Sequence, residues 1–166
     1  MSRIKHNKGF TLIELLVYIG LVVLIGGFLS VTIFYLEEFD LIAFTYNETM
    51  QNGRESMEIM SRYIHKADSV VTPASAGVTS NNLVLSIGGN NVTFSTTPEG
   101  RLQLQDTAGN SNLTTNKVRI NNLTFKRVQN SSTKPTIQVS IQVVYIGTVI
   151  RGPNPTINLT TTVGLR

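Results

Sequence analysis

Cysteine and tryptophan are absent from this 166-residue chain, and histidine occurs only twice. Without cysteine the fold has no disulfide to stabilise it, and no thiol is present for catalysis or metal binding. His6 lies in a basic N-terminal stretch and His65 in a segment of helical pattern, so neither predicts a metal site or a nucleophile with its base. After residue 68 the only acids are Glu99 and Asp106, too few for a calcium site. This inventory predicts a protein that is not an enzyme and has no metal or cofactor.

Charged residues are almost absent from a long N-terminal run. Residues 10–36 carry one charged side chain, Glu14, and the 22 residues from 15 to 36 carry none. A helix of about 20 apolar residues is long enough to cross the hydrocarbon core of a bilayer. The stretch before the run contains three bases and no acid: Arg3, Lys5 and Lys8. This distribution predicts a cytoplasmic N-terminus and a single-pass membrane helix, with the C-terminal part on the other side.

The junction Lys8-Gly9-Phe10-Thr11-Leu12-Ile13-Glu14 joins the basic stretch to the apolar run. It resembles the N-terminal signature of type IV pilins and of the pseudopilins of secretion and DNA-uptake machines. The resemblance implies that a prepilin peptidase cuts between Gly9 and Phe10, and that the new amino group of Phe10 is methylated. It also implies an inner-membrane assembly platform and other pilin or pseudopilin subunits as partners. The mature chain is then expected in the cytoplasmic membrane and later in a periplasmic or cell-surface filament.

Glu14 places a carboxylate near the end of the predicted membrane helix. Such a group costs about 2.5–3.5 kcal/mol at the centre of a bilayer and less near its edge, so it needs a partner. The resemblance implies that this partner is the amino group of Phe10 on a neighbouring subunit of a filament. In the alternative interpretation Glu14 lies at the membrane interface and the chain is a permanent single-span anchor.

Residues 36–67 have the pattern of an amphipathic helix. Apolar or small residues recur at alternating spacings of three and four, with charged residues between them. The series is Leu36, Phe39, Ala43, Tyr46, Met50, Gly53, Met57, Met60, Ile64 and Ala67. We expect this face to pack on a sheet of the same subunit, because its small residues and methionines specify a coiled coil poorly. No proline precedes Pro73, so one helix is predicted from near residue 10 to about residue 67.

From residue 69 onward the periodicity changes to two, which is typical of strands. We predict strands at residues 83–87, 91–95, 101–105, 117–128 (a strand or a hairpin), 136–146 and 156–163. Polar loops are predicted at residues 72–82, 107–116 and 129–135. The fold class is therefore α+β, a long N-terminal helix packed on an antiparallel head sheet of about six strands.

Four segments describe the predicted domain organisation: a basic leader at 1–9, a transmembrane or filament-core helix at 10–36, an amphipathic continuation at 37–68 and a β-rich head at 69–166. The resemblance also has departures. Many major pilins have a disulfide near the C-terminus and a proline in the membrane helix, whereas this chain has no cysteine and has Val31 at the matching place. A strand-rich head without cysteine is more similar to minor pseudopilins. Among these it resembles the J-type, which has a large β-rich head.

Charge is divided unevenly between the predicted stem and head. Residues 37–68 contain seven acids and three bases, and residues 69–166 contain two acids and eight bases, so the stem carries −4 and the head +6. Opposite charges suit subunits that stack with a head beside a stem, although exposed ion pairs contribute only about 0–1 kcal/mol each. A basic head also suits nucleic acid, because phosphate contacts supply affinity for any sequence. The candidate DNA-binding residues are Lys117, Arg119, Lys126 and Arg127. Scattered solubilising charge is the simpler interpretation of the same residues.

These observations predict a structural, minor pilin-like subunit of a type IV pilus, a type II secretion pseudopilus or a DNA-uptake filament. The alternative is a permanently anchored or filament-tip protein whose basic β head binds DNA. The sequence leaves open which of the three machines the chain serves.

Overall fold

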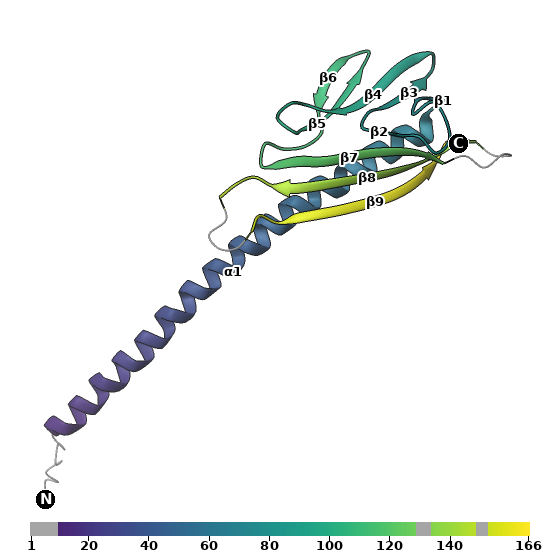
Figure 1. Ribbon diagram of the computed structural model, residues 1–166. Coiled ribbons are helices and arrows are strands. Elements are labelled where there is room, and N and C mark those ends of the chain that lie inside the picture. Colours follow the sequence, from purple (N-terminus) through teal and green to yellow (C-terminus); the bar gives the residue numbers. More distant parts are fainter. Residues whose placement is uncertain (1–9, 129–133, 149–152) are drawn as a thin grey trace, which may run out of the picture. The chain divides into compact units, whose positions relative to one another are not determined.

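The computed structural model describes residues 10–128, 134–148 and 153–166. Within these residues the chain forms one helix followed by nine strands, which are labelled in Figure 1. They are α1 (Leu12–Lys66), β1 (Ser69–Thr72), β2 (Thr79–Ser80), β3 (Leu83–Ile87), β4 (Asn90–Thr96), β5 (Leu102–Asp106), β6 (Gly109–Asn112), β7 (Val118–Val128), β8 (Thr136–Tyr145) and β9 (Thr156–Gly164). The α+β class predicted from the sequence is confirmed. The chain divides into two compact units, Met1–Leu41 and Ile42–Arg166, which are described separately.

Helix α1 begins with a side-chain cap. The hydroxyl Oγ1 of Thr11 accepts a hydrogen bond from the backbone N–H of Glu14 at 3.3 Å. A threonine followed three residues later by glutamate is the spacing of a capping box, which satisfies N–H groups left free in the first turn. The helix ends at Lys66, where basic side chains in the last turn complement the helix dipole.

The first unit contains the N-terminal part of α1, and its side chains are exposed. Every large apolar side chain between residues 10 and 36 is more than half exposed. The hydroxyls of Ser30 and Thr32 donate to the backbone carbonyls of Gly26 and Phe28, each at 2.9 Å. Such bonds within one helix satisfy polar groups where no water is present. By length and composition this helix could cross a membrane.

The second unit contains two antiparallel sheets. Their strand orders are β1-β3-β4-β5-β6 and β2-β7-β8-β9. The prediction of one sheet of about six strands was therefore wrong in number, although the six predicted strands lie within one residue of β3, β4, β5, β7, β8 and β9. Of the missed strands, β2 and β6 fall within stretches predicted as polar loops, and β1 lies in residues for which no strand was predicted. They are only two to four residues long, too short for a period-two pattern to appear, and β6 is exposed throughout.

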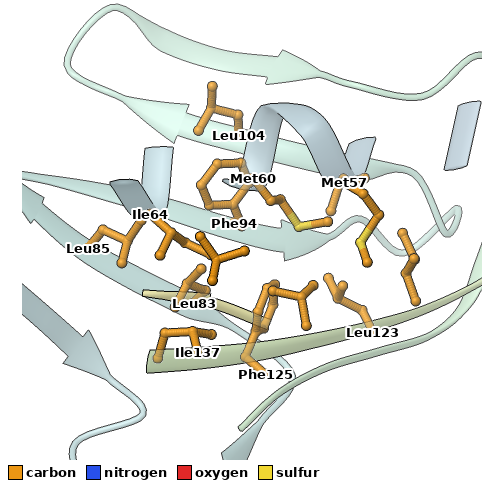
Figure 2. Packing of buried hydrophobic residues seen from close by; sticks show 14 of the residues in the cluster. Met57, Met60, Ile64, Leu83, Leu85, Phe94, Leu104, Leu123, Phe125 and Ile137 are labelled. Carbon is orange, nitrogen blue, oxygen red and sulfur yellow. The ribbon is translucent and has the colours of Figure 1, made fainter. Parts of the chain in front are cut away.

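The hydrophobic core lies between the C-terminal part of α1 and the two sheets. Figure 2 shows Met60 and Ile64 from the helix among side chains of β3, β4, β7 and β8. The largest fully buried side chains include Phe94 of β4 and Phe125 of β7. The ring of Phe94 also meets Tyr63 edge to face, with centroids 5.5 Å apart. Aromatic pairs in this geometry add about 0.5–1.5 kcal/mol to the effect of burial.

The buried face of α1 agrees with the predicted apolar series from Gly53 onward. Met57, Met60, Ile64 and Ala67 are buried, as expected. Earlier in the helix the series is displaced, because Ala43 and Tyr46 are exposed. Gly53 is buried as predicted, but the other buried positions there are polar: Thr45, Thr49, Asn52 and Ser56.

Backbone hydrogen bonds explain how three of these four polar residues are accommodated, the exception being Ser56, whose buried Oγ has no partner within the described residues. Thr49 Oγ1 donates to the carbonyl of Thr45 at 2.7 Å, and Asn52 Nδ2 donates to the carbonyl of Glu48 at 2.8 Å. A buried polar group is costly mainly when it has no partner, so these residues can replace apolar ones.

Candidate functional site

The predicted processing site lies at the start of the described chain. Gly9 falls outside the described residues. Phe10 is the first residue described, and its side chain is 65% exposed. Its ring lies against that of Tyr18, with centroids 5.4 Å apart. The residue whose amino group would be methylated is therefore on the surface of the first unit.

Glu14 lies in the first turn of α1 and is exposed. Its backbone N–H is held by Thr11, and no ion pair joins its carboxylate to any residue within the described ranges. An acid in the first turn interacts favourably with the positive end of the helix dipole, which is a local role that needs no second subunit. The sequence reasoning missed the cap on Thr11, although its signal was available in the spacing Thr-x-x-Glu.

Lys117 is bound to the helix. Its Nζ lies 3.9 Å from Oε2 of Glu48 and 5.1 Å from the centroid of the Phe44 ring. The side chain of Glu48 is only 18% exposed, so the pair is partly shielded from solvent. A cation over an aromatic face contributes about 0.5–1 kcal/mol at exposed sites. Lys117 therefore has an intramolecular role in the head.

The loop before β7 is anchored on the same part of α1. The backbone N–H of Thr115 donates to Oδ1 of Asn52 at 2.9 Å, and its hydroxyl lies 3.4 Å from Oε1 of Glu48. The partners are more than 60 residues apart in the sequence. No local pattern predicts such pairs, which explains why Asn52 and Glu48 were missed.

Arg127 holds the loop between β1 and β2. Its Nη1 donates to the carbonyl of Ala74 at 2.7 Å and lies 3.4 Å from the carbonyls of Val70 and Pro73. The backbone of Arg127 also bonds to the same loop, accepting from the N–H of Gly77 at 2.8 Å. The guanidinium is thus used largely to satisfy carbonyl groups, as expected of a rigid five-donor group.

Arg119 and Lys126 are exposed, and neither makes an ion pair within the described residues, whereas the equally exposed Lys117 pairs with Glu48. They stand opposite Val144 and Gln138 of β8, which are six residues apart. Alternate residues of a strand share a face, so both cations project from the same outer face of the four-stranded sheet. At about 3.4 Å per residue they are separated by roughly 20 Å. The structure therefore does not gather the four candidates into one patch.

Residues 4–30 match the family model of the prokaryotic N-terminal methylation motif. The N-terminus of the chain is therefore similar to this methylation motif. The match includes the Gly9-Phe10 junction and Glu14, and it supports the type IV pilin and pseudopilin family named from these residues. It does not distinguish the J-type subtype. No curated protein and no solved structure matched this pilin-like chain.

Proposed function

We propose that the chain is a minor structural subunit of a type IV pilus-like filament, cleaved between Gly9 and Phe10 and methylated on Phe10. The observation that carries the proposal is the methylation motif at residues 4–30 at the start of a long exposed apolar helix. An apolar surface of this extent is unfavourable in water and requires lipid or other apolar helices around it. A filament core and a membrane both provide such surroundings.

The geometry of the first turn supports an assembly role for Glu14. Cleavage would create a cationic amine on Phe10, next to the positive end of the helix dipole, where a positive charge is unfavourable. The neighbouring subunit's Glu14 would neutralise that amine. Its carboxylate would in turn gain a partner, which it needs in an apolar medium. Since Thr11 fixes the backbone of Glu14 and leaves the carboxylate exposed, the group is available to a second chain.

Partners and location follow from the same proposal. A prepilin peptidase would act on the cytoplasmic side, where the basic leader is retained. An inner-membrane assembly platform would then move the subunit from the membrane into the filament, with the β-rich unit on the far side. The machine served is a pilus, a secretion pseudopilus or a DNA-uptake filament.

The test is the N-terminal peptide of the native chain, measured by mass spectrometry, together with two glutamate variants. We expect a mature start at methylated Phe10. Glu14→Gln should lower filament entry at least tenfold without affecting cleavage. Glu55→Gln is the matched control, since Glu55 is an exposed acid of the same helix, and it should enter filaments like the wild type. An intact leader would instead establish a permanent single-span anchor, and normal entry of Glu14→Gln would remove the assembly role.

A second candidate function is DNA binding by the head, and we propose it only for Arg119 and Lys126. The supporting observation is that both are exposed on one face of a sheet whose strands contain no acid. Arg119→Glu with Lys126→Glu should abolish DNA retention at low salt. The pair Arg54→Glu with Lys66→Glu, at exposed positions of α1 without an ion pair within the described residues, is the control for altered net charge and should retain DNA like the wild type. Equal retention by the wild type and the first double variant would exclude this function.

A further inference from the structure

The two sheets have four edge strands, and three of them are poor templates for another strand. β1 has four residues with an irregular register between Val70 and Thr72, β2 has two residues, and β6 has four. β9 differs from all three. It is the yellow strand at the edge of its sheet in Figure 1. It has nine residues, contains no charge and no proline, and pairs with β8 without a register shift. Proteins normally protect edge strands with charges, prolines, bulges or short length. A long edge strand without these features is open to pairing with a strand of another chain.

The hydrogen bonds flanking β9 show which of its backbone groups are free. Leu165 N–H donates to the carbonyl of Pro135, and Tyr145 N–H donates to the carbonyl of Pro155. Both pairs continue the β8–β9 register, so odd-numbered residues of β9 bond to β8. The even-numbered residues therefore direct N–H and C=O away from the sheet: Thr156, Asn158, Thr160, Thr162 and Gly164. Within the described ranges none of these five has a backbone partner outside β8.

The helix beside this edge leaves two large side chains, Met50 and Tyr46, partly uncovered, and Met50 borders a hollow lined otherwise by polar residues of the same helix. Leu159 of β9 lies over Gly53, where an added Cβ would come within 2.8 Å of Leu159 Cδ1. Asn52, about 100° around the helix axis from Gly53, bonds the loop before β7. At 3.6 residues per turn, the positions beyond Gly53 in the direction from β7 to β9 are Met50 and Tyr46. Met50 is half-buried and Tyr46 is 49% exposed.

We propose that the free edge of β9 is the docking site for an extended, uncharged segment of a different pilin-like subunit, added as a further strand that covers Met50 and Tyr46. This inference rests on the proposed function for the presence of such subunits. Backbone hydrogen bonds would supply affinity, and alternate side chains would supply specificity.

Side chains on the outer face define the chemistry of the segment. Ser140 and Thr160 lie within hydrogen-bond distance at 3.1 Å, and Gln142 donates to Asn158 at 3.0 Å. A fifth strand with hydroxyl or amide groups on that side continues these rows, and its opposite side needs apolar residues to contact the helix. Pairing with β9 of a second copy would be isologous and would close the assembly at two subunits. A different subunit has no such restriction.

The experiment uses the full chain in its native host, with a photo-crosslinking residue in place of Thr162. Thr124, on the outer face of β7 and away from the edge, is the control position for crosslinking. Thr160→Pro removes an outward N–H without breaking the bonds to β8, which proline tolerates at an edge. Thr160→Val is the matched control, because it loses the same hydroxyl and keeps the N–H. Thermal unfolding of both variants checks that the head remains folded.

We expect position 162 to crosslink to an uncharged segment of another chain that carries the methylation motif. Thr160→Pro should reduce this product at least tenfold, Thr160→Val should not, and position 124 should give none. Crosslinks only to a second copy, equal products from position 124, or full crosslinking in Thr160→Pro would each overturn the inference. An uncleaved leader would contradict the proposed function alone, since a membrane crosslink lost in Thr160→Pro would still support the edge site.

Discussion

The two parts of α1 have opposite surfaces within one continuous helix. In the first unit, residues such as Leu24 are exposed although they are strongly apolar. In the second unit, Met60 and Ile64 are fully buried by the sheets. Both parts follow the same backbone geometry, so helix propensity does not account for the difference. What differs is their surroundings: the chain supplies strands that cover one part, and within the described residues it supplies no cover for the other.

Polar residues sharpen this comparison. The part packed on the sheets buries Thr49 and Asn52, whereas the exposed apolar part contains only Ser30 and Thr32 as comparable groups near its centre. In both parts the side chains bond to the carbonyl four residues earlier. Hydrogen bonds to the helix backbone therefore accommodate these four residues in both environments, whereas the buried Oγ of Ser56 has no such partner in the described part of the chain.

The largest expected effect comes from truncating an apolar side chain in each part. Met60→Ala should lower the free energy of unfolding of the β-rich unit by about 2–5 kcal/mol, because it leaves a cavity in a filled core. Leu24→Ala should leave that value unchanged, since Leu24 contacts no part of the core. Chemical denaturation of the full chain in detergent, followed by circular dichroism of the strands, measures both. Equal losses would show that the two parts are not distinct environments.

Asn52 provides the next test, for a polar group on the buried face. Asn52→Ala should destabilise the β-rich unit by about 1–3 kcal/mol, because the N–H of Thr115 loses its acceptor. Asn47→Ala, an exposed asparagine of the same helix, should stay within about 0.5 kcal/mol of the wild type. Hydrogen exchange at Thr115 should accelerate in the first variant only. Unchanged exchange would mean that the loop before β7 is held by other contacts.

Much of the fold could be predicted because its signals are local. The charge-free run, the absence of proline before Pro73 and the alternation within the longer strands each follow from neighbouring residues. The side of the helix that is buried around Thr45 could not be predicted in this way. Thr45 and Thr49 are hydrogen-bonded to the helix backbone, and in sequence they resemble residues that face solvent. The short strands β2 and β6 depend on partners supplied by β7 and β5 and carry no pattern of their own.

The candidate sites divide in the same way. The Gly9-Phe10 junction and Glu14 form a contiguous motif, which a sequence displays directly. The contacts of Lys117 and Arg127 are with Glu48 and with the carbonyl of Ala74, which are distant in the chain. Counting bases in the head predicted their charge correctly but not their contacts.

Replacing a glycine of α1 by alanine should have a smaller effect on stability, and the effect should differ between the two parts. A Cβ on Gly26 would meet open space, so Gly26→Ala should stabilise the helix by up to about 1 kcal/mol. Gly53→Ala gains the same propensity but forces Leu159 to move, so the two terms should nearly cancel. Site-resolved hydrogen exchange along α1 measures the first, and denaturation of the β-rich unit measures the second. A clear gain from Gly53→Ala would mean that Leu159 repacks without cost.

The smallest expected effect concerns Glu99, an exposed carboxylate in the turn between β4 and β5. A hydrogen bond from its own backbone N–H, a second from the Thr97 hydroxyl and the charge of Arg101 lower the pKa of Glu99 below its ordinary 4.5. A carboxyl group whose pKa is lower in the folded state stabilises the fold at pH values above its ordinary pKa. This contribution disappears as the pH falls through the lowered pKa. The β-rich unit should therefore be slightly less stable in Glu99→Gln than in the wild type at pH 7.

That difference should narrow as the pH falls below 4.5, because the wild-type carboxyl then becomes neutral, like the amide of the variant. Denaturation midpoints of the wild type and of Glu99→Gln, measured across this range, provide the test. Glu55→Gln is the control in the helix, since Glu55 is exposed and has no ion pair within the described chain, and its midpoint should follow the wild type at each pH. A gap between Glu99→Gln and the wild type that persists at low pH would assign the effect to turn geometry, because only a contribution from the charge is lost on protonation.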